Sequence, residues 1–525
     1  MIYSSVYPSV EIPKRDLYTE IFETLLPEEL DLVAVTDGVS KFTYGELRTQ
    51  IDAFAGALWA RGIRQGDTVA IQAPNIPLFV IAFFGILRIG AVVTTLNVLY
   101  TSREIVKQLN DSRAKAYVTV KDILPHAEAA ANEVGLTKND IILLDRADGY
   151  VSLIDMLAEN LTPPAIEIDP TNDIAVLPYS SGTTGVPKGV MLSHKNLMVN
   201  ITQAASMLDV NKNDKVMAAL PFFHIYGMNI IMNLTLHKRG TLVTLAKMVF
   251  TDFLSLIQNQ KVTYLYIAPP IAVPLTKNQI VDNYDLSSLR SILTAAAPLD
   301  EKLSDELQRR FSVDIAQGYG MTELSAVSHI TPIGNNKISK GSVGLIVPNM
   351  EFKVVDVETG EDIPEVPGGR TRSGELWIRG PNVMLGYLGN EAATLSTITS
   401  DGWLRTGDIA EVGPYQEVYI VDRLKELIKY KGYQVAPAEL EALILQHPAI
   451  ADVAVVGHPD NDAGEIPHAF VVLQSNAHLS EAQLMEWVSE RVAPHKKVRK
   501  VDFIDIIPKS ASGKILRKEL RPFKN

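Results

Sequence analysis

Residues 173–196 read DIAVLPYSSGTTGVPKGVMLSHKN and form the most informative stretch of the chain. A short apolar strand leads into a loop of small and hydroxyl-bearing residues, and a helix is expected to begin after Ser193. Leu197, Ile201 and Leu208 would then lie on one face of that helix. A strand, a loop and a helix in this order predict an α/β unit whose loop is available to a ligand.

The loop has the composition of an anion-binding cradle. Three glycines let the backbone approach a ligand closely, four hydroxyl groups offer donors, and a lysine adds positive charge. These residues are Gly182, Gly185 and Gly189, then Ser180, Ser181, Thr183 and Thr184, and finally Lys188. The spacing is not that of a Walker A loop, because Pro187 and Val190 stand where that motif requires glycine. An ordinary flexible turn is the alternative, and the Pro-Lys-Gly that follows the loop argues against it.

On both sides of this loop, up to about residue 340, strand-like runs alternate with helical periodicity. One example is the strand expected at Thr68–Gln72, followed by a helix at Leu78–Ile89 and a strand at Ala91–Thr95. This alternation predicts an α/β fold. Proline and acidic residues cluster at 163–170, which marks a boundary between two α/β blocks.

The rest of the chain has a different character. Between Gly341 and Gly389, closely spaced Gly and Pro separate short β-rich segments, which predicts a small antiparallel unit. A module of about a hundred residues follows, with a helix from Pro437 and another opened by a Ser480/Gln483 capping box. Between these helices, strands are expected at 452–456 and 469–473. The pattern therefore predicts a terminal α+β domain.

Composition and charge narrow the class of protein. A chain of 525 residues with 46% apolar residues is too long for one core, and its formal charge of −12 argues against a nucleic-acid binder. The last 35 residues nevertheless hold eleven Lys and Arg against three Asp and Glu, as expected of a domain that meets small anions. The absence of cysteine excludes disulfides, a cysteine nucleophile and metal ligation by thiolates. No secretory signal is recognised, and the apolar run Phe79–Leu99 is interrupted by Arg88, so we expect a cytoplasmic protein without integral membrane association.

Six further segments complete a family resemblance. They are PFFHIYG (221–227), YDLSSLR (284–290), QGYGMTE (317–323), GWLRTGD (402–408), VDRLKELIKYKGYQVAPAELEA (421–442) and PKSASGKILRKEL (508–520). With the loop at 173–196, these segments resemble the adenylate-forming superfamily in order and spacing, over nearly the whole chain. They look most like 4-coumarate–CoA ligases and their bacterial relatives.

The resemblance implies a multidomain α/β architecture. Residues 1–424 would form a large domain of two α/β subdomains, about 1–170 and 171–340, and a small β-barrel-like subdomain at 341–424. Lys425 would be a hinge, and residues 426–525 would form a small mobile α+β domain. The reaction that the resemblance implies has two steps, adenylation of an acid and formation of a thioester. Each step would bring a different face of the small domain to the same site, so this domain would rotate about Lys425.

The resemblance also assigns a nucleotide site. Tyr319 offers an aromatic face for a purine, Thr322 a hydroxyl for the α-phosphate, and Glu323 a carboxylate for Mg²⁺. Asp408 and Arg423 would bind the ribose. The complete set expected to contact ATP or AMP is Ser180, Ser181, Gly182, Thr183, Thr184, Gly185, Lys188, Ala296, Gln317, Gly318, Tyr319, Gly320, Thr322, Asp408 and Arg423.

The remaining roles concern the acid and CoA. Lys514 would bridge the substrate carboxylate and the α-phosphate during adenylation, Lys429 and Gln434 would serve thioester formation, and His224 would gate the acyl tunnel. The acyl pocket is expected to consist of Tyr226, Ile230, Leu293, Ala295, Gly318, Ala326 and Val327. CoA contacts are expected from Lys247, Lys431 and Gly432.

The implied activity converts ATP, a carboxylic acid and CoA into acyl-CoA, AMP and pyrophosphate, with Mg²⁺ as cofactor and a monomer or weak homodimer as the working form. The acid suggested by the resemblance is 4-coumarate or another hydroxycinnamate of phenylpropanoid metabolism. Two departures leave this open: Ala295 replaces a glycine of the plant enzymes, and Ile230 replaces a residue that is often polar or smaller. Medium-chain fatty or arylalkanoic acids are therefore alternatives, as are a luciferase-like monooxygenase, a peptide-synthetase adenylation domain and a nucleotide sensor without enzymatic activity.

Overall fold

The computed structural model describes most of the chain, and its sheets follow from the patterns above. The described residues are 1–180, 187–296, 299, 301–334, 337–431, 433–460, 463–475, 477–492, 494–510 and 513–521. Within them, no helix combines the length and the apolar character needed to cross a membrane.

The first large sheet is mainly parallel. Its strands, in spatial order, are β10 (Tyr179–Ser180), β11 (Lys188–Ser193), β9 (Ile174–Val176), β5 (Val92–Thr95), β4 (Thr68–Ile71), β6 (Ala116–Thr119), β7 (Ile141–Leu143) and β8 (Val151–Ser152), and β21 (Gly386–Tyr387) pairs with β11. The helices around it are α1 (Tyr44–Ala60), α2 (Pro77–Arg88), α3 (Ser102–Ser112), α4 (Leu124–Glu133), α5 (Leu153–Ala158) and α6 (His194–Met207). The helix expected after Ser193 is confirmed as α6, where the Ser193 side chain accepts a hydrogen bond from the Asn196 N–H.

The second large sheet is also mainly parallel. Its strands, in spatial order, are β18 (Leu345–Ile346), β17 (His329–Ile330), β16 (Asp314–Tyr319), β15 (Ser291–Thr294), β14 (Tyr264–Ile267), β12 (Lys215–Ala218), β13 (Thr241–Thr244), β2 (Val33–Thr36) and β3 (Lys41–Thr43). Its helices are α7 (Leu234–His237), α8 (Phe250–Gln260), α9 (Pro269–Lys277) and α10 (Glu301–Phe311). The six strands β16, β15, β14, β12, β13 and β2 are parallel to one another.

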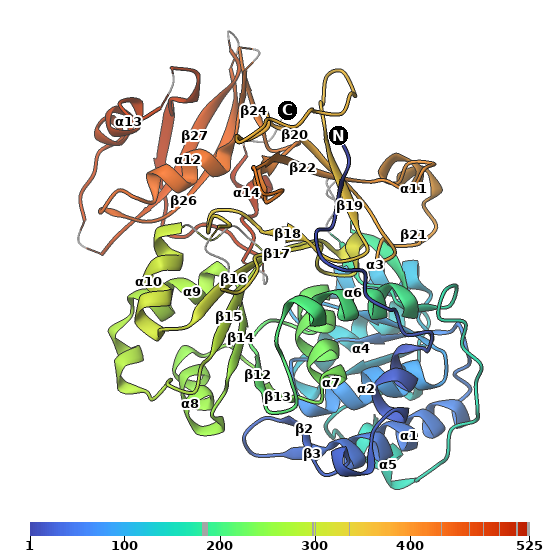
Figure 1. Cartoon of the computed structure of the whole chain (residues 1–525). Coiled ribbons are helices and arrows are strands. Elements are labelled where there is room, and N and C mark those ends of the chain that lie inside the picture. The colour runs from blue at the N-terminus through green and yellow to red at the C-terminus, as the bar shows by residue number, and fades with distance from the viewer. Residues whose placement is uncertain are drawn as a thin grey trace.

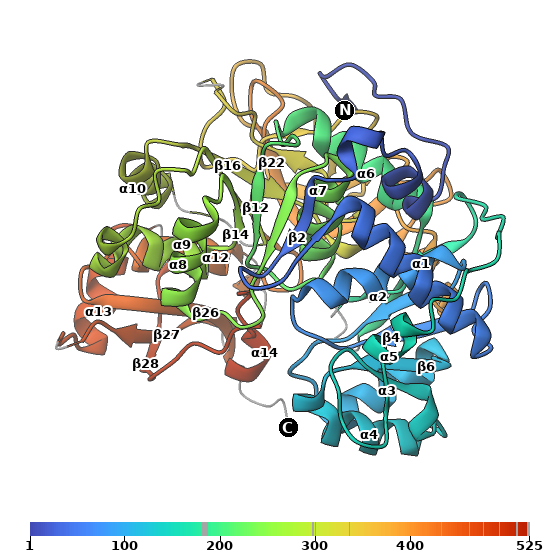
Figure 2. The same ribbon diagram turned by 90° about the horizontal axis from the view of Figure 1, so that it is seen from below.

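The two sheets and their helices stack in layers (Figures 1 and 2). Alternate residues of each strand face opposite sides: Val69 and Ile71 belong to the central core, whereas Ala70 packs with α3 and α4 outside the first sheet. In the second sheet, Val216 faces the same central core and Met217 faces α8 and α9. Helices α1, α2 and α6 contribute side chains to this central core, and the strands β4, β5, β6, β14 and β15 are buried along their whole length.

The predicted boundary at residue 170 does not match the sheets. Strands β2 and β3, residues 33–43, lie at the edge of the second sheet, and β9 to β11, residues 174–193, lie in the first. The prediction was wrong because hydrophobic patterns identify strands but not their partners, and these strands pair with segments distant in sequence.

A third, antiparallel sheet follows, as the Gly and Pro spacing predicts. Its order is β1 (Tyr3–Ser4), β19 (Glu351–Val355), β20 (Gly374–Arg379), β22 (Leu404–Val412) and β23 (Val418–Arg423), with α11 (Glu391–Thr397) beside it. Among the described residues its edge strands β1 and β23 do not pair, so the expected barrel-like closure is not seen. Turn residues predict short strands and do not determine whether the edges of their sheet meet.

The terminal domain, which we define as the described residues from 426 onward, stands apart from the two large sheets in Figure 1, in orange and red. Its sheet has the order β25 (Tyr433–Val435), β24 (Ile428–Tyr430), β27 (Gly464–Leu473) and β26 (Ile450–Asp460), and β28 (Lys500–Phe503) pairs with β27. Its helices are α12 (Pro437–Ile444), α13 (Glu481–Ser489) and α14 (Arg517–Leu520). Both predicted helix starts are confirmed, including the Ser480/Gln483 capping box.

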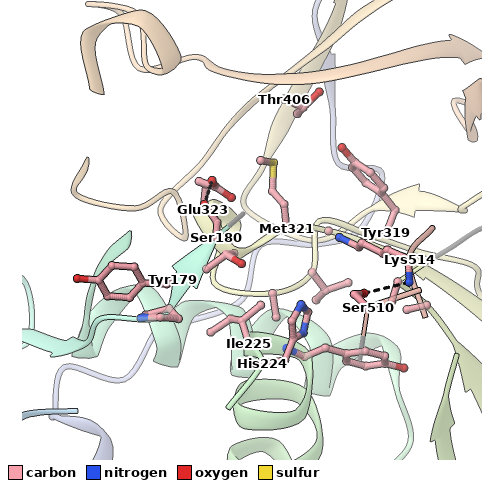
Figure 3. Close-up of a pocket in the computed structure, with 18 of the residues that line it drawn as sticks. Tyr179, Ser180, His224, Ile225, Tyr319, Met321, Glu323, Thr406, Ser510 and Lys514 are labelled. Carbon is pink, nitrogen blue, oxygen red and sulfur yellow. Dashed lines mark hydrogen bonds between the residues drawn. The ribbon is translucent and has the colours of Figure 1, made fainter. Parts of the chain in front are cut away.

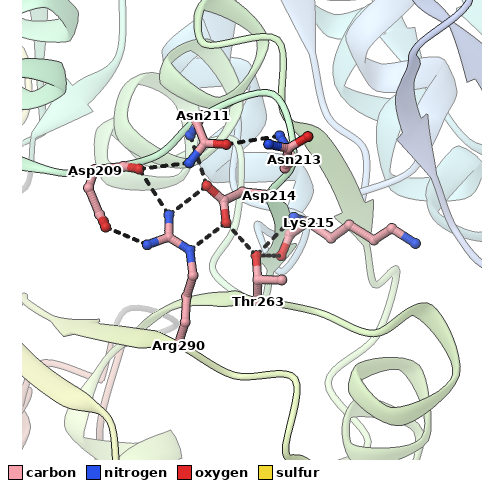
Figure 4. Close-up of polar contacts among 7 residues, drawn as sticks. All are labelled: Asp209, Asn211, Asn213, Asp214, Lys215, Thr263 and Arg290. Atoms are coloured by element: carbon pink, nitrogen blue, oxygen red, sulfur yellow. Dashed lines mark hydrogen bonds and ion pairs between the residues drawn. The ribbon is translucent and has the colours of Figure 1, made fainter.

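The YDLSSLR segment ends in a polar cluster around the buried Asp214 (Figure 4). Arg290 donates to both carboxylate oxygens of Asp214, at 2.6 Å each, and to Asp209. The Asp214 side chain is only 3% exposed and also accepts from the Thr263 hydroxyl. These residues lie at the amino ends of β12, β14 and β15, away from the strand ends that carry the segments PFFHIYG and QGYGMTE. The segment therefore has a structural role.

Replacement of Arg290 by methionine should destabilise the large domain by about 3 kcal/mol, because it leaves a buried carboxylate without its cation. Urea unfolding followed by circular dichroism measures this loss. Arg146→Met is the matched control, since Arg146 and its partner Asp155 are 63% and 60% exposed and such pairs contribute about 1 kcal/mol or less. Equal losses for the two variants would contradict the structural role of Arg290.

Candidate active site

A cavity of about 650 Å³ lies at the carboxyl ends of the strands in the second sheet. The chain passes from β12 to β13 on one side and then to β14 on the other, so the strand order reverses beside β12. Such a reversal opens a crevice where α/β proteins bind ligands. The loops after β12, β15 and β16 line this cavity, and loops from the first sheet, the third sheet and the terminal domain complete it.

Most of the described residues that the sequence predicted for the site line this one cavity. They are Ser180, Lys188, His224, Tyr226, Ile230, Leu293, Ala295, Ala296, Gly318, Tyr319, Gly320, Thr322, Glu323, Ala326, Val327, Arg423, Lys425 and Lys514. Ser181, Gly182, Thr183, Thr184, Gly185 and Gly432 lie outside the described residues. In Figure 3, Lys514 and Tyr319 are on one side of the cavity, and Ser180 and Glu323 are on the other.

On the side of Tyr319, an aromatic ring and a carboxylate are joined by a hydrogen bond. The Tyr319 hydroxyl donates to Asp408 Oδ2 at 2.5 Å, and Arg423 Nε lies 3.3 Å from Asp408 Oδ1. Burial, followed by the charge of Asp408, raises the pKa of Tyr319, so the phenol stays protonated. Strand register places Asp408 directly opposite Arg423. Tyr319 and Arg423 thus give the cavity a ring and a guanidinium suited to a nucleoside, whereas Asp408, which both of them contact, does not line the cavity.

On the opposite side, Glu323 is buried and has hydroxyl partners. Its Oε1 accepts from Ser180 and from the Tyr387 hydroxyl, at 2.9 Å each. The Lys188 ammonium lies over the Tyr387 ring, 4.7 Å from its centroid, and Lys188 pairs with Ser180 across two strands. A carboxylate, a hydroxyl and an ammonium group are therefore close together, as a site for phosphate and a bound cation requires.

The predicted magnesium contact fits this geometry. The described residues contain no cluster of three or more His, Asp or Glu side chains that would bind a metal by themselves. Mg²⁺ is commonly held by one or two carboxylates together with substrate phosphates. Glu323, which is 4% exposed and accepts a hydrogen bond from Ser180, is suited to that arrangement.

Lys514 lines the cavity from the terminal domain, at the end of a turn that is paired with Ser510. The Ser510 N–H donates to the Lys514 carbonyl at 2.8 Å, and the Lys514 N–H donates to Ser510 Oγ at 3.2 Å. Gly513 permits the approach, because its φ is +82° and a Cβ there would lie 2.6 Å from Pro270 Cγ. Burial and then the Arg423 guanidinium lower the pKa of Lys514 to about 8, while Asp408 and Glu323 oppose this. At neutral pH the side chain is still mostly protonated.

His224 is close enough to Lys514 to respond to its charge. Burial, followed by Lys514, lowers the pKa of His224 to about 3, so the imidazole is neutral. Its Nδ1 accepts from the Tyr226 N–H at 3.3 Å, which leaves the proton on Nε2. Figure 3 shows the ring projecting into the cavity, so a neutral donor faces the space between the two sides.

The deeper part of the cavity is apolar. Tyr226 begins a π-helix that runs to Asn233, and its hydroxyl donates weakly to the Leu293 carbonyl at 3.4 Å. The surrounding side chains are Ile230, Leu293, Ala295, Ala326, Val327 and Ile330. Ala296 and Ala326 have φ values of +74° and +130°, so the backbone is strained beside the pocket. This wall suits an uncharged organic group.

Several predicted residues do not line the cavity. Gln317 is buried, and its side-chain oxygen accepts a hydrogen bond from the Leu299 N–H. It therefore stabilises the segment between β15 and α10. Lys429 is exposed, and strand pairing places it opposite Gln434 on the β24–β25 hairpin. Lys431 and Lys247 are also exposed. The described lysines predicted for thioester formation and CoA, Lys429, Lys431 and Lys247, therefore do not line the cavity in this arrangement.

Sequence reasoning missed two side chains that shape the site. Asn75 holds the segment after β12: its amide donates to the carbonyls of Ala218 and Leu220, and its Oδ1 accepts from Phe222. Glu375 accepts from the Gly407 N–H at 3.0 Å and so fixes the turn before Asp408. Neither residue belongs to a distinctive motif. The available signals were positional: Asn75 follows the strand β4, and Glu375 lies in the GELWIRG strand.

A second cavity of about 350 Å³ adjoins the first and shares Pro221, Phe223 and Ser510 with it. Ala246 and Met248, the neighbours of Lys247, belong to its wall, which is mostly apolar. Lys509, Ser510 and Gly513 of the terminal domain also line it. The loop that carries Lys514 to the first cavity thus contacts the second as well.

Comparison with known protein families and sequences agrees with this geometry. Residues 23–388 match the family model described as AMP-binding enzyme, and residues 439–514 match the AMP-binding enzyme C-terminal domain. The chain is 40% identical over 535 residues to a 4-coumarate–CoA ligase of Vanilla planifolia, covering 99% of this chain and 96% of that protein. It is 41% identical over 542 residues to 4-coumarate–CoA ligase 2 of Nicotiana tabacum, covering 99% and 97%.

Solved structures show the same fold. The anthranilate CoA ligase AuaEII in complex with anthranoyl-AMP superposes with a TM-score of 0.89 at 28% identity, covering 97% of both chains. ATP-bound MatB from Rhodopseudomonas palustris gives 0.87 at 30% identity, covering 96% of this chain and 98% of that one. The chain therefore belongs to the AMP-binding enzyme family and, within it, to the adenylate-forming CoA ligases.

Proposed function

We propose that this ligase activates 4-coumarate or a closely related hydroxycinnamate as an acyl-adenylate and transfers the acyl group to CoA. The observation that carries the proposal is the position of Lys514, which the terminal domain brings into one cavity with a nucleoside surface, an anion-binding side and an apolar pocket. Sequence identity of 40–41% to 4-coumarate–CoA ligases over 99% of the chain supports the choice of acid.

In the first half-reaction a carboxylate oxygen attacks the α-phosphorus of ATP, the bond to the β-phosphate oxygen breaks, and pyrophosphate leaves. Such a transfer depends on positioning and on neutralisation of charge, and it needs no protein nucleophile. Lys514 would hold the carboxylate against the α-phosphate, while Thr322 and Lys188 would bind phosphate oxygens. Magnesium bound at Glu323 would supply additional positive charge to the phosphates.

In the second half-reaction the CoA thiolate attacks the acyl carbon and AMP leaves. We place the approach of CoA in the second cavity, which meets the first at Phe223, beside His224. Its wall includes Ser510 and Gly513, and the Lys514 loop must withdraw before Lys429 and Gln434 can take its place. A rotation of the terminal domain about Lys425 would exchange the two sets, since Lys425 lies between β23 and β24.

The acyl pocket bears on which acid is preferred. In the predicted acyl pocket, Ile230 contributes an apolar side chain and Tyr226 contributes a ring with a phenolic hydroxyl. A hydroxycinnamate ring fits such a wall, and its 4-hydroxyl would find few hydrogen-bond partners there. Cinnamate-like, arylalkanoic or medium-chain acids are the second candidates because the same wall favours them.

Ile230→Ser should raise kcat/KM for 4-coumarate relative to cinnamate by about two- to thirteenfold, since one buried hydrogen bond contributes about 0.5–1.5 kcal/mol. Steady-state assays with both acids measure the ratio. Ile230→Val is the control and should leave the ratio unchanged. An unchanged ratio in the serine variant would place the ring hydroxyl elsewhere.

A mass-spectrometric panel tests the proposed function. Purified protein, Mg-ATP, CoA and a set of carboxylic acids are incubated, and acyl-AMP and acyl-CoA are quantified. Preferred formation of 4-coumaroyl-CoA or a related thioester is expected. Preference for a fatty acid would correct the substrate, and acyl-AMP without any thioester would favour a luciferase-like enzyme or an adenylation domain, which oxygen-dependent light or loading of a carrier protein would distinguish.

A further inference from the structure

Helix α12 of the terminal domain is capped by a residue on the other side of the predicted hinge. Its N-cap position is Ala436, which has no side-chain acceptor. The Ala438 N–H instead donates to Asp422 Oδ2 at 2.9 Å, and Asp422 belongs to β23 of the third sheet. Lys425 lies between these two residues in the chain, so the hydrogen bond crosses the hinge.

The Asp422 carboxylate is placed to make this contact strong. The side chain is 6% exposed, and its Oδ1 accepts from the Arg423 N–H at 2.6 Å. A negative charge at the N-terminus of a helix is stabilised by the helix dipole. Hydrogen bonds to ionised groups are also stronger than those between neutral groups.

A cation of the terminal domain also acts on the charge of the same carboxylate. Arg517 donates to both oxygens of Glu441, at 2.7 and 2.8 Å, and to the Val455 carbonyl. Burial raises the pKa of Asp422, and the nearby Arg517 guanidinium counteracts this. Arg517 is three residues beyond Lys514, and thus the charge cluster and the lysine loop belong to one continuous segment.

Apolar side chains from both sides of the hinge pack at this junction. Ile409, Val421 and Leu424 come from the third sheet and its end, and Leu427 and Ala436 come from the terminal domain. Apolar packing has little directional preference, whereas a charged helix cap requires one orientation. The cap therefore adds a directional, charged contact across the hinge, beside the backbone hydrogen bonds from Glu426 and Leu427 to the Arg423 carbonyl.

We infer that Asp422 is a positioning residue which holds the terminal domain in the adenylating arrangement and thereby keeps Lys514 in the first cavity. This inference rests on the proposed two-step function. A rotation about Lys425 would carry Ala438 and Arg517 away with the terminal domain and leave Asp422 behind. Loss of the Asp422 carboxylate should then destabilise the adenylating arrangement, in which Lys514 lies in the first cavity, and should not destabilise the thioester-forming arrangement.

The test compares the two half-reactions in Asp422→Ala. Acid-dependent ATP–pyrophosphate exchange should fall about tenfold or more, since tenfold is the equivalent of about 1.4 kcal/mol and a hydrogen bond to a charged group contributes about that much or more. Thioester formation from preformed acyl-adenylate and CoA should be unchanged or faster. Ser480→Ala is the matched control, because it removes the cap of α13 within the terminal domain and should not alter the ratio of the two rates.

A second variant removes the donor instead of the acceptor. Ala438→Pro deletes the N–H in the first turn of α12, where proline is tolerated, and it creates a Pro-Pro start like that of α9 at Pro269. It should reproduce the Asp422→Ala ratio even if that variant folds poorly. Equal losses in both half-reactions, or no loss in either, would overturn the inference. Absence of pyrophosphate exchange in the wild-type protein with every acid would instead contradict the proposed function.

Discussion

Lys514→Ala should lose acid-dependent ATP–pyrophosphate exchange by about 10²-fold or more, because in the proposed mechanism its ammonium group stabilises charge that develops in the adenylation transition state. The same variant should still convert preformed acyl-adenylate and CoA into the thioester, since the proposed mechanism gives Lys514 no part in that step. Rapid-quench assays of each half-reaction measure the two rates separately.

Lys518→Ala is the control for Lys514→Ala. Lys518 is exposed on α14, four residues further along, and its loss changes the net charge of the segment by the same amount. It should leave both half-reactions unchanged. Equal loss in the two variants would show that the positive charge of the whole segment matters, and unchanged exchange in Lys514→Ala would refute its assignment.

Lys425→Pro should reduce steady-state thioester formation by about 10²-fold while pyrophosphate exchange continues, because a fixed φ at the proposed hinge would prevent the proposed rotation of the terminal domain between steps. The acyl-adenylate should then accumulate on the enzyme. Quantification of bound acyl-AMP and released acyl-CoA over time checks this expectation.

Lys425→Ala distinguishes an effect of backbone rigidity from an effect of the lost side chain, which lines the cavity. Alanine leaves φ free, so thioester formation should persist. If the alanine and proline variants were equally impaired, the lysine side chain would be the important feature. If neither were impaired, the hinge would lie elsewhere.

Local structure was predictable wherever it depended on neighbouring residues. The Ser193 cap of α6, the proline start of α12 and the Ser480/Gln483 capping box are confirmed, because each reflects hydrogen bonds within one turn. Strand partners were not predictable in the same way. The first sheet receives β9 to β11 and the second receives β2, although the chain pattern alone favoured a division at residue 170.

The candidate site shows the same contrast. The family segments identified Tyr319, Glu323 and Lys514, and the described structure brings them to one cavity. Contacts between distant segments were not visible in the sequence: examples are the approach of Gly513 to Pro270 and the Asp422 cap on α12. These contacts depend on how the terminal domain is oriented, and no local pattern encodes that orientation.

Transfer of an oxygen isotope tests the central claim most directly. The preferred acid is labelled with ¹⁸O in its carboxylate and incubated with ATP, CoA and the enzyme, and the products are analysed by mass spectrometry. Attack of the carboxylate on the α-phosphorus predicts that AMP acquires one ¹⁸O atom and pyrophosphate acquires none. Label in pyrophosphate or phosphate, or formation of ADP in place of AMP, would contradict an acyl-adenylate mechanism.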